Sequence, residues 1–200
     1  MAKKKDPFVL ERSTFDLQPL QRPFCAARRF VLKDDPRASL PIVRMTDAFM
    51  RHVTHDPGVI CRSWKPVRVM SIRINSLVSH RDMLAKIGGI ELARLSAEII
   101  FRLLQMHGVF GSTIGPLLRT ALMSNIFYIP DRFGKDVIVS IVFTGSNHNE
   151  GWVLDAEPVS RPSGCIPTGS RIFYPSPLFG DGLPDVERGD ADLIIDPDDP

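Results

Sequence analysis

The sequence has little of what marks membrane-spanning, secreted or disulfide-linked proteins. Its longest apolar runs, such as Val137–Phe143, fall far short of the roughly 20 residues that span a bilayer. No apolar segment follows the basic residues at positions 3–5, so we expect neither a secretory signal nor a transmembrane segment. The three cysteines, Cys25, Cys61 and Cys165, are odd in number and widely spaced, which favours a reducing, intracellular compartment such as the cytoplasm over a disulfide framework.

Motifs for nucleotide binding and serine nucleophiles are also missing. The chain contains no Gly-x-x-x-x-Gly-Lys-Ser/Thr, no Gly-x-Gly-x-x-Gly after a predicted strand, and no Gly-x-Ser-x-Gly. Residues 108–111, between two predicted helices, are similar in spacing to the GXXG loop of KH modules. Their inner residues are Val and Phe rather than basic, so we interpret the segment as a glycine C-cap followed by a turn.

His52 and His55 lie three residues apart on a predicted short helix, with Cys61 close in sequence. Such a pair could bind zinc with a third ligand, or activate the cysteine as a nucleophile. The second cluster of ligands that metal sites usually show is missing, and the other histidines are scattered. We therefore assign no catalytic residue, no metal and no cofactor, and interpret the pair as surface histidines beside a turn. Asp155 and Glu157 share one face of a predicted strand, a spacing that many solvated pairs also have.

Charge is distributed unevenly along the chain. Residues 1–80 carry 15 Lys or Arg against 7 Asp or Glu, and residues 81–150 carry 7 against 6. Residues 151–200 carry 3 against 10. A basic N-terminal half attracts anionic partners and an acidic end repels them, although tails can also drift in composition without a function.

Apolar residues recur every three or four positions between Gly89 and Gly108, which predicts one long amphipathic helix. Its opposite stripe is polar and alternates in sign, so we expect that stripe to face solvent. The residues of the polar stripe are Glu91, Arg94, Glu98, Arg102 and Gln105.

Other segments predict the strands and short helices of an α+β domain, in which an antiparallel sheet packs against the long helix. Capping residues indicate helices beginning at Thr46 and Ser79. The predicted strands are 24–32, 59–64, 67–78, a three-stranded meander of 126–129, 137–143 and 152–154, and an edge strand at 171–174, with a further helix at 116–124.

The predicted organisation is one domain between two flexible ends. Residues 1–23 read as a basic, proline-interrupted arm, residues 24–174 as the core domain, and residues 175–200 as an acidic disordered tail. The apolar triplet Leu193, Ile194 and Ile195, bracketed by aspartates, is a candidate protein-docking motif.

Basic residues along two neighbouring predicted strands could form one surface for an anionic partner, either nucleic acid or an acidic membrane or protein surface. Trp64 lies among them and could stack on a base. The candidate binding residues are Lys3, Lys4, Lys5, Arg28, Arg29, Arg62, Trp64, Lys65, Arg68 and Arg73.

These observations favour a non-enzymatic structural or assembly protein, whose basic N-terminal half binds an anionic partner and whose tails mediate association with another protein or with a second copy. This outline, with a basic arm, an α+β body and self-association, resembles that of small viral matrix-type proteins. The segment Gly151–Asp155, which follows a hairpin, looks like the terminal hairpin of rhabdovirus-type matrix proteins. Five residues do not assign a family, but the outline would imply association with virions. The alternatives are an RNA- or DNA-binding subunit of a ribonucleoprotein and, second, a small Cys/His enzyme.

Overall fold

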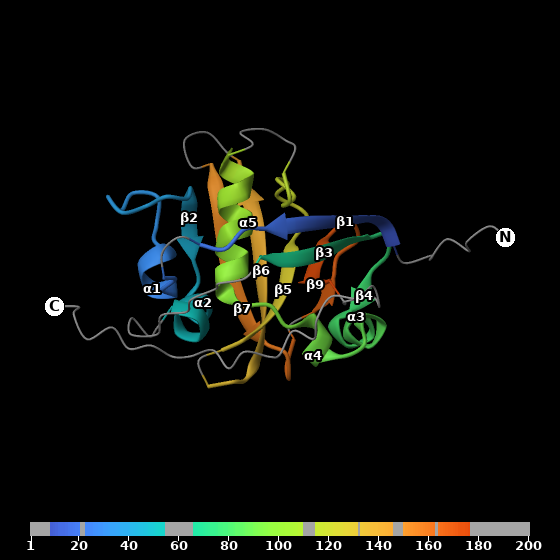
Figure 1. The fold of residues 1–200 in the computed structure, drawn as a ribbon. Helices are drawn as coiled ribbons and strands as arrows, with labels where there is room; N and C mark the ends of the chain where they lie inside the picture. The colour runs from blue at the N-terminus through green and yellow to red at the C-terminus, as the bar shows by residue number, and fades with distance from the viewer. Residues whose placement is uncertain are drawn as a thin grey trace.

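The computed structural model describes residues 9–20, 23–54, 66–109, 115–131, 133–145, 150–162 and 164–176. It confirms the α+β class: within these residues one seven-stranded sheet has the order β1-β3-β9-β5-β6-β7-β2, with helices on both faces (Figure 1). The strands are β1 (Val9–Leu17), β2 (Ile42–Met45), β3 (Val67–Ile74), β5 (Asn125–Pro130), β6 (Asp136–Thr144), β7 (Gly151–Pro158) and β9 (Arg171–Pro175).

The sheet is mixed rather than purely antiparallel. The predicted meander β5-β6-β7 is antiparallel, as are β1-β3 and β3-β9, whereas β2-β7 and β5-β9 are parallel. The prediction of an edge strand at 171–174 is wrong, because β9 lies between β3 and β5 and buries Ile172 and Phe173 on its two faces. Residues 9–17, predicted within the arm, form the edge strand β1.

One face of the sheet contributes side chains to the main hydrophobic cluster. This cluster includes Phe127 of β5, Trp152 of β7 and Phe173 of β9, and helix α5 (Ala97–Val109) covers it. Figure 1 shows α5 running along the sheet, with α1 (Ala26–Arg29), α2 (Asp47–Phe49) and the π-helix η1 (Met50–Thr54) beside β2. Thr46 caps α2 as predicted, since its hydroxyl accepts from the Phe49 amide.

Residues 26–29 form helix α1, so the predicted strand at 24–32 is wrong. The amide of Phe30 donates to the carbonyl of Ala26, which closes a single helical turn. This turn brings the rings of Phe24 and Phe30 to 5.6 and 5.8 Å from the ring of Phe101 on α5. The apolar residues that gave the pattern of a strand therefore lie on either side of a single helical turn, where they pack against α5.

The predicted long helix is also broken, into α4 (Ile90–Ala93) and α5. Between them the chain is extended, and the Leu95 amide donates to the Tyr128 carbonyl at 2.8 Å. Ala93 belongs to the hydrophobic cluster on one face of the sheet and Leu95 to the cluster on the other. The break lets the chain pass from one face of the sheet to the other. The apolar periodicity continues across it because α4 and α5 each turn their apolar side toward the sheet.

The second face is only partly covered. On this face, helices α3 (His80–Ile87) and α4 pack over β3, β9 and β5. The two-stranded pair of β4 (Val78–Ser79) and β8 (Cys165–Ile166) packs there as well. Ser79 caps α3 as predicted, because its hydroxyl accepts from the Asp82 amide at 3.0 Å. The β6, β7 and β2 portion of this face carries no helix among the described residues (Figure 1).

The predicted helix at 116–124 is not formed. Two buried side chains fix this segment instead. Asn125 donates to the carbonyl of Leu118 and accepts from its amide, and the Arg171 guanidinium donates to the Pro116 carbonyl at 2.8 Å. No helix in the described ranges has both the length and the apolar composition needed to cross a membrane.

Candidate binding groove on the open sheet face

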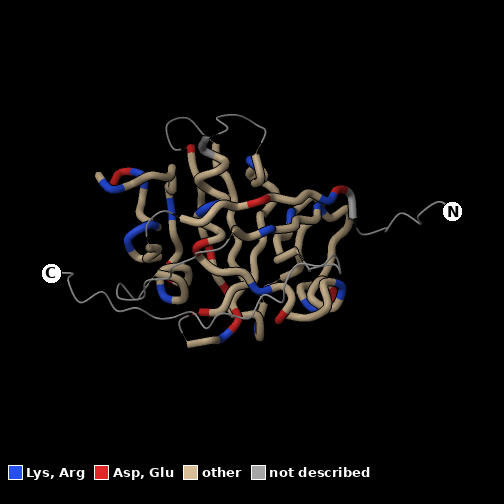
Figure 2. Tube along the Cα trace, in the orientation of Figure 1, with Lys and Arg blue, Asp and Glu red and all other residues tan. Residues whose placement is uncertain are grey.

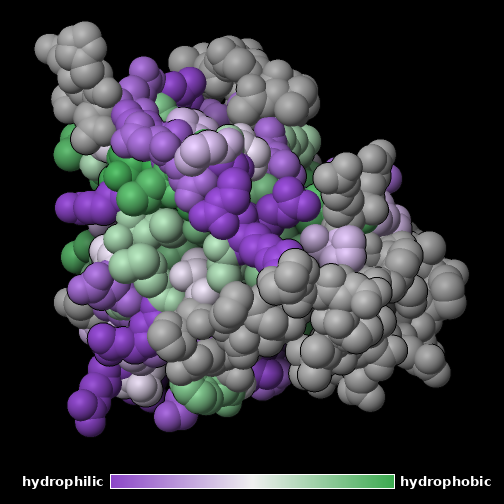
Figure 3. Space-filling model, turned by 90° about the vertical axis from the view of Figure 1, so that its left-hand side faces the viewer, coloured by the Kyte–Doolittle hydropathy of each residue, from purple (hydrophilic) through white to green (hydrophobic). Residues whose placement is uncertain are grey.

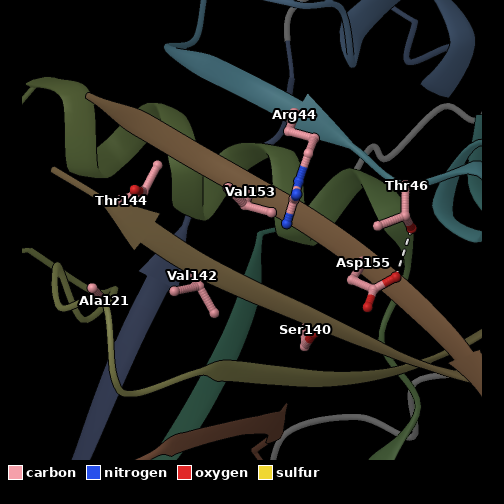
Figure 4. Close-up of a pocket in the computed structure, with 8 residues that line it drawn as sticks. All are labelled: Arg44, Thr46, Ala121, Ser140, Val142, Thr144, Val153 and Asp155. Atoms are coloured by element: carbon pink, nitrogen blue, oxygen red, sulfur yellow. Dashed lines mark hydrogen bonds between the residues drawn. The ribbon is translucent and has the colours of Figure 1, made fainter. Parts of the chain in front are cut away.

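A groove with a volume of about 340 Å³ lies on the uncovered part of the sheet. Side chains of β6, β7 and β2 form its floor and one wall, and a residue of the 115–124 segment forms the other (Figure 4). The residues that line it are Arg44, Thr46, Ala121, Ser140, Val142, Thr144, Val153 and Asp155.

Strand alternation explains the polar floor. In β6, Val139, Ile141 and Phe143 point into the main core, so the residues between them face the groove. The pairing of Ser140 with Asp155 places a hydroxyl and a carboxylate on neighbouring strands of this face.

A bulge in β2 directs Arg44 into the groove. Ile42 pairs with Trp152, but Arg44 pairs with Val153, so one extra residue lies in β2. Without that residue Arg44 would lie on the same face as Ile42, which is fully buried. Figure 4 shows the Arg44 side chain extending from β2 over β7.

The chain at Pro41, just before β2, passes so close to the start of β7 that position 151 requires a glycine. A Cβ atom there would overlap the Pro41 carbonyl oxygen and the Val43 side chain. The absence of that atom lets the Trp152 amide donate to the Pro41 carbonyl at 2.7 Å. Gly151 thus holds β2 and its arginine beside β7.

The polar groups of the groove differ in how they are satisfied. The Thr46 hydroxyl donates to Asp155 Oδ1 at 2.6 Å, which orients that carboxylate. Arg44 is exposed and makes no hydrogen bond or ion pair within the described part of the chain. Val142 and Val153 provide an apolar strip between these groups. A cation, a carboxylate and hydroxyls along an apolar strip suit an extended ligand with both polar and apolar groups.

Arg44 belongs to a wider basic region. We call residues 23–54, which carry α1, β2, α2 and η1, the basic lobe. Its acidic residues are Asp34, Asp35 and Asp47. Its basic residues, which outnumber them, are Arg28, Arg29, Lys33, Arg37, Arg44 and Arg51. Figure 2 shows these basic positions gathered around α1 and β2, and Figure 3 shows this side of the molecule, where hydrophobic surface is bordered by hydrophilic side chains.

One acidic residue of the lobe is already paired. The Arg37 side chain hydrogen-bonds both oxygens of Asp35, and this contact together with the Arg37 amide lowers the pKa of Asp35 to about 2. Asp35 therefore neutralises Arg37 rather than Arg44.

Two of the predicted anion-binding residues, Arg68 and Arg73, do not lie on the same surface. Arg68 and Arg73 are five residues apart on the regularly paired strand β3, so they project from opposite faces. Arg68 is exposed and pairs with Asp16 at 2.7 Å, whereas Arg73 donates to the Gly169 carbonyl at 3.3 Å. That part of the prediction is corrected.

The remaining candidates divide into two groups. Arg28 and Arg29 lie on α1, and the Arg29 guanidinium is 5.9 Å from the centre of the Phe101 ring, within cation–π range. The others lie outside the described residues: Lys3, Lys4, Lys5, Arg62, Trp64, Lys65, Leu193, Ile194 and Ile195.

His52 contacts a carboxylate. Its Nδ1 atom is 3.1 Å from Oδ2 of Asp131, in the hairpin between β5 and β6. Burial raises the pKa of Asp131, but hydrogen bonds from the Lys135 amide, from His52 and from the Phe133 amide outweigh it and lower the pKa overall. No group of three metal-ligating side chains occurs among the residues described. His55 and Cys61 lie outside the described residues, and the Cys/His enzyme stays a prediction.

Comparisons with protein-family models, curated proteins and solved structures gave no match. The groove is therefore interpreted from its own geometry. The sequence pattern places Asp155 and Glu157 on one face of a predicted strand but does not single out Arg44, because no feature of the sequence marks the bulge that turns it.

Proposed function

We propose that this protein is a non-enzymatic assembly protein that binds an acidic segment of a partner protein through Arg44 and the basic lobe, and that also self-associates. The observation that carries the proposal is the Arg44 guanidinium, which has no partner among the residues described, over an open groove lined by hydroxyls and an apolar strip. A guanidinium offers forked donors that match a carboxylate. The surrounding excess of positive charge would speed encounters with acidic chains.

The groove's own carboxylate favours a peptide over nucleic acid. Asp155 lines the same groove as Arg44, on β7, two residues from Val153, with which Arg44 pairs (Figure 4). A nucleic-acid backbone carries a charge at every phosphate and would place one near Asp155, whereas a peptide can place a carboxylate at Arg44 and an amide at Asp155. Binding to RNA or DNA, the second reading of the sequence, is thus the competing outcome of the test.

The chain supplies a suitable probe. A labelled peptide of residues 181–200 contains eight Asp or Glu and the triplet Leu193–Ile195. We would titrate it with a chain that ends at Ser176, which removes the chain's own copy of that segment, and compare it with a single-stranded RNA of similar length. Fluorescence anisotropy at several salt concentrations reports the affinity and its electrostatic part.

A matched pair of substitutions tests the site. Arg44→Gln should weaken peptide binding about tenfold, the effect of losing one charge-assisted hydrogen bond. Arg68→Gln removes another exposed arginine, which lies outside the groove, and should leave the affinity unchanged. Equal effects of the two substitutions, or RNA binding that is tighter and insensitive to Arg44→Gln, would contradict the proposal.

A further inference from the structure

We propose that two copies of this chain pair through β1, antiparallel about a twofold axis at Thr14, so that their sheets join into one continuous sheet. The inference rests on the self-association in the proposed function and names its surface. It is independent of the groove, which lies near the opposite edge of the sheet.

The two edges of the sheet differ in what they offer to a partner. β1 has nine residues and pairs with β3 alone among the described strands. β2 has four residues, and the Ile42 carbonyl already accepts from the Lys33 amide at 2.7 Å. A long edge with unpaired backbone groups is a template for another strand. β1 is therefore the edge to which a second copy can add.

The alternation of β1 sets the geometry of such a pair. Phe15 and Leu17 pack toward the main core, and the even-numbered residues Arg12, Thr14 and Asp16 are exposed on the other face. A twofold axis perpendicular to the sheet keeps both cores on one side, and it requires each residue to meet a partner of the same parity. The axis must then pass through one residue rather than between two.

Charge selects the register. With the axis at Thr14, Arg12 faces Asp16 of the second copy, and this opposite-charge pair occurs twice. With the axis at Ser13, Arg12 faces Thr14 instead, and with the axis at Phe15 it faces Gln18. Only the Thr14 register matches opposite charges, and it also stacks the two threonines, a favourable cross-strand pair.

The charges concerned are available for this contact. Arg12 makes no hydrogen bond or ion pair within the described ranges. Asp16 is held by Arg68, whose Nε and Nη2 atoms lie 2.7 and 3.4 Å from its two oxygens, while 60% of its side chain remains exposed. An approaching Arg12 would complete a network around an already oriented carboxylate. Residues 11–17 pair with β3 without a register shift, so the backbone is regular over the length needed.

Charged residues on an edge strand also serve to keep proteins apart. That role predicts a monomer, and disulfide trapping distinguishes the two. Directly opposed residues of antiparallel strands have Cα atoms about 4.5–5.5 Å apart, within the range that a disulfide bridges. We would replace Cys61 and Cys165 with Ser and then introduce single cysteines into β1 of the full chain.

Thr14→Cys should form a disulfide-linked dimer under mild oxidation. Arg12→Cys and Asp16→Cys should not cross-link alone, because each position is displaced from its own copy by four residues, about 13 Å. An equimolar mixture of the latter two should cross-link. Thermal unfolding of the reduced variants confirms that each one folds.

Charge reversal gives a second test in solution. By sedimentation velocity, Arg12→Asp and Asp16→Arg should each weaken the homodimer about tenfold, since each creates two like-charge pairs. A mixture of the two variants restores both opposite-charge pairs and should form a heterodimer at least as stable as the unmodified dimer.

The possible results separate this inference from the wider proposal. A dimer that does not cross-link at Thr14 overturns the β1 register and leaves self-association through another surface. A monomer at every concentration overturns both the register and self-association, while peptide binding at Arg44 stands on its own measurement.

Discussion

Arg102 Nη1 lies 3.1 Å from Glu98 Oε1 on α5, and both side chains are almost fully buried. These residues belong to the stripe that the sequence predicts to face solvent, so that prediction is wrong for them. Burial lowers the pKa of Arg102, and the charge of Glu98 counteracts it. The guanidinium also donates to the Gln18 carbonyl after β1. The pair thus joins the helix to the chain that leaves the edge strand.

Removing one member of this pair should cost more than removing both. Arg102→Leu leaves the carboxylate of Glu98 buried beside an apolar side chain and should lower the free energy of unfolding by about 3–5 kcal/mol. Glu98→Leu combined with Arg102→Leu removes both charges from this buried position and should lower the free energy of unfolding by less. Urea denaturation of the two variants provides the comparison. A double variant less stable than Arg102→Leu would show that each side chain contributes separately.

A second ion pair holds the break between α4 and α5. Arg94 Nε and Nη2 contact the two oxygens of Asp136 at 2.7 and 3.0 Å, at the start of β6. Arg94→Ala should lower the free energy of unfolding by about 1–2 kcal/mol, because this pair is bidentate and partly buried. Arg37→Ala removes a pair whose arginine is 66% exposed and should lower the free energy of unfolding by clearly less, because solvent screens that pair. Chemical denaturation measures both, and equal losses would contradict the role given to Arg94.

The close contact at Gly151 predicts a strong effect of a single methyl group. Gly151→Ala should lower the free energy of unfolding by about 1–3 kcal/mol, as overpacking does, because the Pro41 carbonyl must move. It should also weaken binding at Arg44, which β2 carries. Gly145→Ala is the control, since an added Cβ there meets no atom within 4 Å. A stable Gly151→Ala variant would show that β2 can pair with β7 at a greater distance.

Two buried histidines predict the pH dependence of stability. Burial lowers the pKa of His80 and of His107 below the ordinary value of about 6.5. The unfolded chain therefore binds protons that the folded chain does not, and stability falls as the pH drops below about 6.5 toward the folded pKa values. Neither ring nitrogen of His107 has a hydrogen-bond partner in the described structure, and its ring lies 5.2 Å from that of Trp152.

Replacement of His107 should therefore flatten this pH dependence. His107→Phe keeps the ring contact, and its free energy of unfolding should change less between pH 7.5 and 5.5 than that of the unmodified chain. Tryptophan fluorescence in urea follows the transition at each pH. An unchanged slope in the variant would assign the pH dependence to His80 or to other groups.

Capping residues and strand alternation in the sequence predict the local structure where neighbouring residues determine it. Thr46 and Ser79 cap the helices that follow them, and the apolar alternation of residues 126–154 yields the meander. These features depend on neighbouring residues, whose preferences the sequence displays directly.

Tertiary contacts determine the structural features that the sequence pattern leaves open or predicts wrongly. The helix break at Arg94 depends on hydrogen bonds to Tyr128 and Asp136, more than 30 residues away. The groove combines residues from three strands, and the bulge that turns Arg44 into it depends on pairing with β7. Periodicity cannot display such contacts, because a helix pattern looks the same whether or not a distant backbone interrupts it.

The central position of β9 has a consequence for the order of assembly during synthesis. β3 and β5 each complete their pairing with β9, whose residues follow those of β3 by about 100 positions in the chain. Until residue 175 has left the ribosome, the sheet consists of two unconnected parts with open inner edges. Because the contacts of β9 with β3 are far apart in sequence, we expect the nascent chain to fold slowly. During this period the open edges of the two parts of the sheet need protection from pairing with other chains.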